Sequence, residues 1–253
     1  MKRVAMRSNE DLMEAVTLIT GVWMSAMLDY PGFRDWKLFQ IDSILNAGDP
    51  VPDISESHPA KFAFPSHIER QLDVITALFG LARTWQALTD TQFYFRRYPF
   101  NDLPVSLEAH LQYICEAYHT QVYEFRERLK ILITAINKAI SRNTVDGKIV
   151  KCFDEDFNYE IRIRHFITHH ASFKDPIIER IDFEGMFSRS INSIKGDREW
   201  REVQRRTYRK ASKLWAHRAE LGSEKARLYL NAAARLVIKN CRFLSEPPKF
   251  TLS

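Results

Sequence analysis

Apolar residues recur every three or four positions from Ser106 to about Arg142, and this run restricts the fold of the 253-residue chain most strongly. That spacing places apolar side chains on one face of an α-helix. A helix of roughly 35 residues would be about 50 Å long. With only 8 Gly and 10 Pro, the chain has few turns, and no segment has the alternation of a strand. The sequence therefore predicts an all-α fold, a bundle of long antiparallel helices.

Capping patterns and periodicity predict the other helices. Ser8-x-x-Asp11 and Ser66-x-x-Glu69 have the form of capping boxes, and Ser106 is a candidate N-cap of the long helix. Gly222 is expected to end one helix. Asp154, Glu155 and Asp156 are expected in the first turn of another, where the helix dipole favours acids. The predicted helices cover about 8–28, 36–45, 66–95, 106–142, 154–173, 183–194, 197–221 and 223–246.

Three regions are expected along the chain. They are an N-terminal helix and loop over 1–65, a helical core over 66–173, and basic C-terminal helices over 174–253. The segment from Tyr30 to Pro65 holds most of the Pro and Gly of the N-terminal half and is expected to be largely a loop. The strongest candidate boundary is 172–196.

Charge and cysteine content indicate which partners and which cellular location to expect. The net charge of the chain is +5, but it is unevenly distributed. The segment 196–243 has 13 Lys and Arg and 5 Asp and Glu, a net charge of +8, so the rest of the chain has a net charge of −3. Such a segment fits a polyanion, an acidic protein or a solvated helix face. Three distant cysteines support neither disulfides nor a zinc site, which favours a reducing, cytoplasmic location. The uncharged run from Ala15 to Leu28 is too short to span a bilayer and is expected to be a buried helix, with no membrane partner.

Arginine and histidine gather between Ile161 and Phe173, in the sequence I-R-I-R-H-F-I-T-H-H-A-S-F. Arginine offers phosphate a fixed positive charge, and histidine transfers protons near neutral pH. On one helix, Arg162, His165 and His169 form a stripe, whereas Arg164 lies about 140° from His169. Arg164 and His169 would meet on one phosphate near a helix end, across a bend, or with a second subunit, so the pattern favours a homodimer.

The spacing Arg164-His165-x-x-x-His169 resembles the R-(polar)-x-x-x-H signature of the HEPN superfamily. The run from Tyr118 to Lys130, Y-H-T-Q-V-Y-E-F-R-E-R-L-K, resembles the long helix that packs beside that motif. The resemblance covers about 106–173. It implies an α-helical, usually dimeric protein that acts as a metal-independent ribonuclease of a toxin–antitoxin or phage-defence system. An antitoxin or regulatory protein would be a partner.

The resemblance also implies roles for the motif residues. His169 would act as general base on the ribose 2′-OH or as acid on the leaving 5′-oxygen, and His165 would orient His169 or the phosphate. Arg164 would hold the scissile phosphate and stabilise its developing charge. The substrate would be RNA, no cofactor or metal is implied, and the product would end in a 2′,3′-cyclic phosphate. Further candidates for contacting phosphate or RNA are Arg162, His170, Arg201, Arg205, Arg206 and Arg209.

Structural roles are alternatives for the same side chains. Arg164 could form an ion pair with Glu160, Asp154 or Glu155. His169 and His170 could interact with the last carbonyls of their helix. His165 and His169 have the i, i+4 spacing of a two-histidine metal site, but no third ligand is evident, which disfavours a metal. The aromatic run 93–98 could stack bases but is more typical of a core.

The sequence departs from the family at one position. Some HEPN toxins have a tyrosine two residues after the motif histidine, which a partner nucleotidyltransferase modifies. Here that position is Ala171, so silencing by this modification is not expected, and a different antitoxin would be the partner. The main alternative is a non-catalytic helical module whose basic C-terminal helices bind nucleic acid or a protein. A third interpretation is an immunity or regulatory subunit that kept the fold without turnover.

Overall fold

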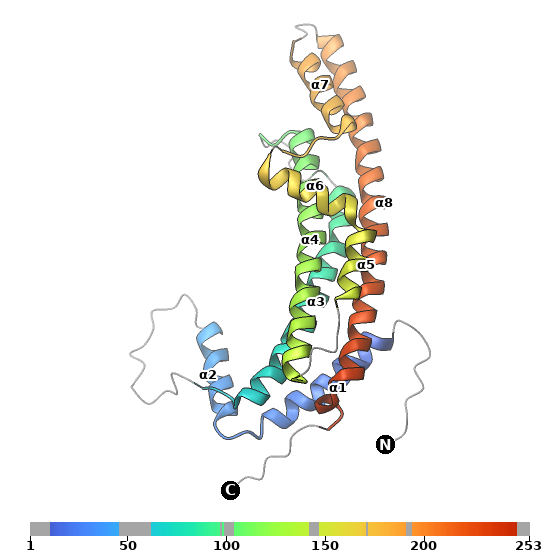
Figure 1. Cartoon of the computed structure of the whole chain (residues 1–253). Coiled ribbons are helices and arrows are strands. Elements are labelled where there is room, and N and C mark those ends of the chain that lie inside the picture. The colour runs from blue at the N-terminus through green and yellow to red at the C-terminus, as the bar shows by residue number, and fades with distance from the viewer. Residues whose placement is uncertain are drawn as a thin grey trace. The chain divides into compact units, whose positions relative to one another are not determined.

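The computed structural model describes residues 11–45, 62–96, 98, 104–141, 147–170, 172–190 and 194–246. Regular structure in these ranges is entirely helical, which confirms the expected all-α class (Figure 1). None of the described helices is long and apolar enough to cross a membrane. The elements are α1 (Asp11–Met27), α2 (Phe33–Leu45), α3 (Ser66–Arg96), α4 (Leu107–Ala139), α5 (Lys148–Asp156), α6 (Asn158–His169), α7 (Pro176–Ser190), α8 (Ile194–Asn240) and the short 3-10 helix η1 (Arg242–Leu244).

The chain divides into two compact units, each of which combines segments distant in sequence. The first unit comprises Met1–Leu78, Ile133–Val145 and Ala233–Ser253, and the second comprises Phe79–Leu132 and Asp146–Ala232. Three helices, α3, α4 and α8, contribute residues to both units. All the candidate site residues belong to the second unit.

Aromatic packing dominates the first unit. The Trp23 indole N–H donates a hydrogen bond to Gln71 Oε1 at 3.0 Å, and the ring is fully buried. Phe33, at the start of α2, packs against Phe62 and Phe64, with ring centroids 5.5 and 4.7 Å away. The expected helices at 8–28 and 36–45 are present, although Ser8 lies outside the described residues. Of the expected loop, 46–61 also lies outside the described residues.

The long helix that the sequence predicted forms the centre of the second unit. Ser106 caps it, because its Oγ accepts a hydrogen bond from the backbone N–H of Ala109 at 3.0 Å. Its apolar face is buried as expected, and α3 runs antiparallel to it (Figure 1). The buried face includes Leu111, Tyr118, Val122, Phe125 and Leu129.

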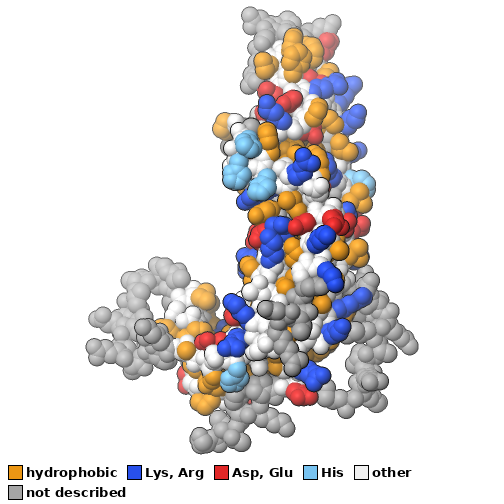
Figure 2. Space-filling model, in the orientation of Figure 1, with side chains coloured by type: hydrophobic (Ala, Val, Ile, Leu, Met, Phe, Trp, Pro, Cys, Tyr) orange, Lys and Arg blue, Asp and Glu red, His pale blue; other side chains and the backbone are white. Residues whose placement is uncertain are grey.

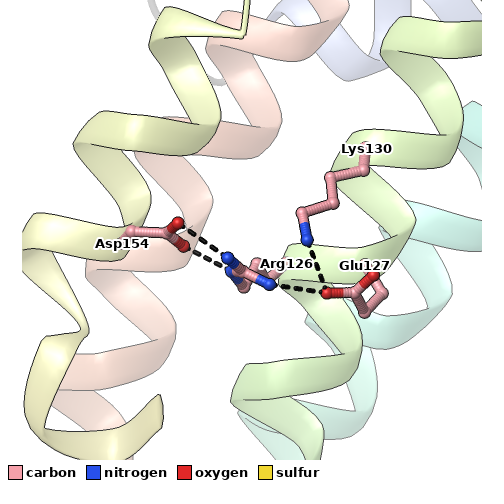
Figure 3. A network of polar contacts seen from close by, with 4 residues as sticks. All are labelled: Arg126, Glu127, Lys130 and Asp154. Carbon is pink, nitrogen blue, oxygen red and sulfur yellow. Dashed lines mark hydrogen bonds and ion pairs between the residues drawn. The ribbon is translucent and has the colours of Figure 1, made fainter. Parts of the chain in front are cut away.

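The helix expected over about 154–173 is instead two helices, α5 and α6, separated by a turn at Phe157. The acids expected in a first turn therefore lie at the C-terminal end of α5, where the helix dipole disfavours negative charge. Polar partners offset this cost. Arg126 of α4 binds Asp154 through two nitrogens, at 2.5 and 2.8 Å (Figure 3). Tyr229 of α8 donates a hydrogen bond to Asp156 at 2.7 Å. The turn allows Phe153 and Phe157 to be buried together, with centroids 4.4 Å apart.

Other boundaries differ in detail. Helix α7 starts at Pro176, earlier than the expected 183, because the Asp175 carboxylate accepts a hydrogen bond from the backbone N–H of Ile177 at 2.9 Å. On α8, Leu214 is 52% exposed, whereas its neighbour Trp215 is buried. The three cysteines are free: Cys152 on α5 is exposed, whereas Cys115 and Cys241 are buried.

Gly222 does not end a helix, because α8 continues through it as one element of 47 residues. The residue is buried, and a Cβ atom there would lie 2.5 Å from the Tyr118 hydroxyl oxygen and 3.3 Å from two ring carbons. Tyr118 is itself fully buried. Gly222 therefore permits α8 to approach α4 closely, which is a packing role.

We expect Gly222→Ala to lower the free energy of unfolding by about 1–3 kcal/mol, because the new methyl group overpacks the contact with Tyr118. The matched control is Gly80→Ala on α3, where a Cβ would meet only Arg128 side-chain atoms at 3.6 and 3.9 Å. That substitution should stabilise the protein by up to about 1 kcal/mol through helix propensity. Urea denaturation measures both changes, and equal effects at the two glycines would contradict the packing role.

Candidate functional site

The N-terminal half of α6 is anchored by Arg218 of α8. The Arg218 guanidinium lies over the rings of Tyr159 and Trp215, 4.4 and 4.8 Å from their centroids. Its Nε is 3.9 Å from Glu160 Oε1. Stacking on two rings restricts a guanidinium group more than a surface ion pair does. The base of α6 is thus fixed, and the following turns carry the arginine and histidine cluster.

Arg164 is held against α4 by an aromatic ring. Its guanidinium carbon is 4.1 Å from the centroid of Tyr123, and the side chain is half-buried. Among the described residues, Arg164 forms no ion pair. Two of the carboxylates that could have paired with it are taken by other arginines: Glu160 by Arg218 and Asp154 by Arg126. The positive charge of Arg164 is therefore positioned without being neutralised by these acids.

Three histidines lie close together at the end of α6: His165, His169 and the C-cap residue His170, all of them exposed. The rings of His165 and His169 are 5.5 Å apart, and those of His169 and His170 are 6.4 Å apart. The His165 ring also lies 6.3 Å from that of Tyr123. Within the described part of the chain, no ring nitrogen of these three histidines has a hydrogen-bonding partner. Their interaction with the last carbonyls of the helix is therefore not found there. Figure 2 shows histidine side chains gathered on α6 with basic side chains nearby.

Three further expectations concern the surroundings of this cluster: Arg162, Ala171 and a metal site. Arg162 is exposed, on the same α6 helix. Ala171, the position at which some HEPN toxins have tyrosine, lies outside the described residues. No three His, Cys, Asp or Glu side chains in the described ranges form a group that could hold a metal ion.

The basic candidates on α8 separate into two groups. Arg201, Arg205 and Arg209 are exposed at intervals of four residues and so follow one another along the helix, with Lys213 one turn further. Arg206 lies about 100° around the axis from Arg205. Its Nη2 is 2.5 Å from Glu202 Oε1, so its charge is paired. Among the described residues, no hydrogen bond, ion pair or ring contact joins Arg205, Arg206 or Arg209 to the α6 cluster.

The aromatic run 93–98 is divided between core and surface. Phe95 is fully buried, whereas Phe93 and Tyr94 are 53% and 62% exposed. The Arg96 guanidinium lies over Phe93, 4.9 Å from its centroid. The expectation of a core role is confirmed for Phe95 and is wrong for Phe93 and Tyr94.

Sequence reasoning missed two residues of α4: Tyr123, which contacts Arg164, and the buried His119 one turn before it. Tyr123 carries no motif, but it lies four residues after His119 on α4, on the same helical face. His119 is fully buried, with the rings of Phe173 and Trp215 at 5.4 and 5.9 Å. Neither His119 ring nitrogen has a hydrogen-bonding partner in the described structure. Burial and the nearby positive charge of Arg218 lower the pKa of His119 to about 3.

Comparison of the chain with protein-family models, with curated proteins and with solved structures found no match. The resemblance to HEPN proteins thus rests on the motif and on its setting, a short helix against a long one.

Proposed function

We propose that the protein is a metal-independent RNA endonuclease whose site is the α6 cluster. One observation carries the proposal: Arg164 is fixed on Tyr123 at 4.1 Å and forms no ion pair among the described residues. The exposed ring of His165 lies 6.3 Å from the same tyrosine ring and 5.5 Å from the ring of His169. A positioned cation attracts a phosphate, and adjacent imidazoles can move protons.

The reaction would proceed by attack of the ribose 2′-oxygen on the adjacent phosphorus. His169 accepts the 2′-OH proton or donates a proton to the departing 5′-oxygen, while Arg164 binds the phosphate oxygens as charge develops. His165, whose ring lies 5.5 Å from that of His169, orients His169 or the phosphate. The P–O5′ bond breaks as the P–O2′ bond forms. One product carries a 2′,3′-cyclic phosphate and the other a 5′-OH.

A homodimer would complete this site. A single copy presents the histidines on an exposed helical surface, and Arg164 lies about 140° from His169 around the helix axis. A second copy facing the first would supply the complementary acid or base and would exclude water from the phosphate. The biological setting proposed with this activity is a toxin–antitoxin or phage-defence system, in which an antitoxin or regulatory protein would restrain cleavage.

The test is incubation of total cellular RNA with the purified protein in EDTA, with Arg164→Ala/His169→Ala purified in parallel. We expect fragments ending in 2′,3′-cyclic phosphate from the wild type and none from the double variant. Equal cleavage by both proteins, or cleavage by neither, would remove the support for catalysis at α6. Circular dichroism of the double variant checks that the two substitutions leave the helices intact.

A second candidate is favoured by the row of exposed basic residues along α8. In this case the protein would bind nucleic acid or an acidic partner through Arg201, Arg205 and Arg209 without cleaving it. Fluorescence anisotropy with a labelled RNA distinguishes the two functions when combined with the cleavage assay. Salt-sensitive binding that Arg205→Gln weakens, together with intact RNA, would favour this candidate.

A further inference from the structure

A pocket of about 420 Å³ lies in the second unit, between the end of α3 and the middle of α8. Tyr208 and Ser212, both buried, line it, and Ala216 contributes a small side chain. The Tyr208 hydroxyl lies 3.0 Å from His110 Nδ1, and Ser212 donates a hydrogen bond to the Phe95 carbonyl. These polar groups are thus satisfied by the protein itself. The volume falls in the range of sites for small ligands.

The charged side chains that line the pocket are mostly basic. Arg96, Arg209 and Lys213 line it, against one acid, Glu220. Glu220 lies 3.6 Å from the ring of His217, which also lines the pocket. The three cations and the one acid of the lining therefore sum to +2.

Two of these cations are available to a ligand. Arg209 and Lys213 are exposed, and neither makes a hydrogen bond or ion pair with the described residues, whereas Arg206 on the same helix is paired with Glu202. Arg96 approaches from α3, where Gln92 accepts a hydrogen bond from its Nη2 at 3.0 Å and Phe93 lies beneath its guanidinium. Three cations therefore surround the pocket from two helices, and one of them is held in position by its neighbours.

We propose that this pocket binds a phosphate-bearing ligand of the size of a mononucleotide. Arginine donates paired hydrogen bonds to phosphate oxygens, and lysine adds a point charge. A volume of about 420 Å³ is larger than a phosphate group requires and leaves room for an attached sugar and base. The phosphate can come from a free nucleotide or from the backbone of an RNA strand. Arg205 lies one turn before Arg209 on α8, where it could meet the next phosphate of such a strand.

This site is separate from the α6 cluster, because it uses none of the residues to which cleavage is assigned. Ligand binding at the pocket can therefore be tested whether or not the protein cleaves RNA. Arg164→Ala/His169→Ala should bind the ligand as well as the wild type does.

The experiment is isothermal titration calorimetry of the full chain with 5′-AMP, with adenosine as the uncharged match. We expect AMP to bind and adenosine to bind at least about tenfold more weakly, because charge-assisted hydrogen bonds to the phosphate are absent. Arg209→Gln and Lys213→Gln should each weaken AMP binding by roughly tenfold. Glu220→Gln should strengthen it, because the substitution removes the one acid of the lining.

The matched control is Lys225→Gln, which removes one positive charge from the same helix about 18 Å from Lys213. Its AMP affinity should equal that of the wild type. Absence of AMP binding, equal affinity for adenosine, or unchanged affinity in Arg209→Gln/Lys213→Gln would overturn the proposal. Competition between AMP and a short labelled RNA, in the Arg164→Ala/His169→Ala variant, then identifies where the bound phosphate comes from. If AMP displaces the RNA, the pocket binds a phosphate of the RNA backbone. If the RNA stays bound alongside AMP, the pocket binds a free nucleotide.

Discussion

Arg164→Ala should lower the rate of RNA cleavage by about 10²–10³-fold, the usual cost of losing one group that stabilises transition-state charge. His169→Ala should cost about 10²–10⁴-fold, because it removes proton transfer. Arg164→Lys should retain part of the activity, since it keeps the charge without the planar group that stacks on Tyr123. Single-turnover cleavage of a short RNA measures these rates.

The same assay tests Tyr123 as a positioning residue for Arg164. Tyr123→Phe keeps the ring beneath the guanidinium and should leave the rate near that of the wild type. Tyr123→Leu removes the ring and should reduce the rate of the otherwise wild-type protein. In a protein that already carries Arg164→Ala, Tyr123→Leu should cause little further loss. If Tyr123→Phe were as damaging as Tyr123→Leu, the ring would not be what positions Arg164.

Matched controls separate these effects from general loss of basic residues. Arg128 on α4 is exposed and pairs with Glu124 at 3.2 Å, and His67 on α3 is exposed. Arg128→Ala and His67→Ala should cleave at the wild-type rate. A comparable loss in either control would show that the assay responds to charge or folding and not to the α6 cluster.

His119 should make the protein sensitive to acid. Its pKa is lowered from 6.5 to about 3, so the folded protein binds fewer protons than the unfolded chain between these values. The contribution to stability is therefore fully present above pH 6.5 and is lost as the pH falls toward 3. Within this window the free energy of unfolding should decrease by up to about 1.4 kcal/mol per pH unit.

His119→Leu isolates this contribution. The substitution removes a buried polar ring that has no hydrogen-bonding partner in the described structure, so stability at neutral pH should be retained or increased. Urea denaturation across pH 4–7 should then show a shallower slope. A residual slope is expected from His110, whose pKa burial also lowers. A slope as steep as that of the wild type would contradict the role assigned to His119.

The sequence predicted the helical fold because its strongest signals were local. The spacing of apolar residues and the Ser106 cap depend on neighbours a few residues away, and both are found in the structure. Gly222 shows the limit of such reasoning. A glycine between two amphipathic segments is typical of a helix end, and only the position of Tyr118, 104 residues earlier in the sequence, shows that it serves packing.

The site was predictable only in part, for the same reason. The sequence placed Arg164, His165 and His169 on one helix, and the structure has them on α6. It could not show that Glu160 and Asp154 pair with Arg218 and Arg126, because those partners come from other helices. The break at Phe157 was equally hidden, because it depends on burying Phe153 and Phe157 together.

The three thiols differ in exposure, and this gives the chain one natural site for selective labelling. Burial raises the pKa of Cys115 well above its ordinary value and that of Cys241 to about 12, so both are poor nucleophiles as well as shielded. Cys152 alone is exposed, on α5 directly before α6. A maleimide spin label would therefore attach at one place per copy without any mutation. Two copies facing each other across α6 would place two such labels in one particle, with a single distance between them.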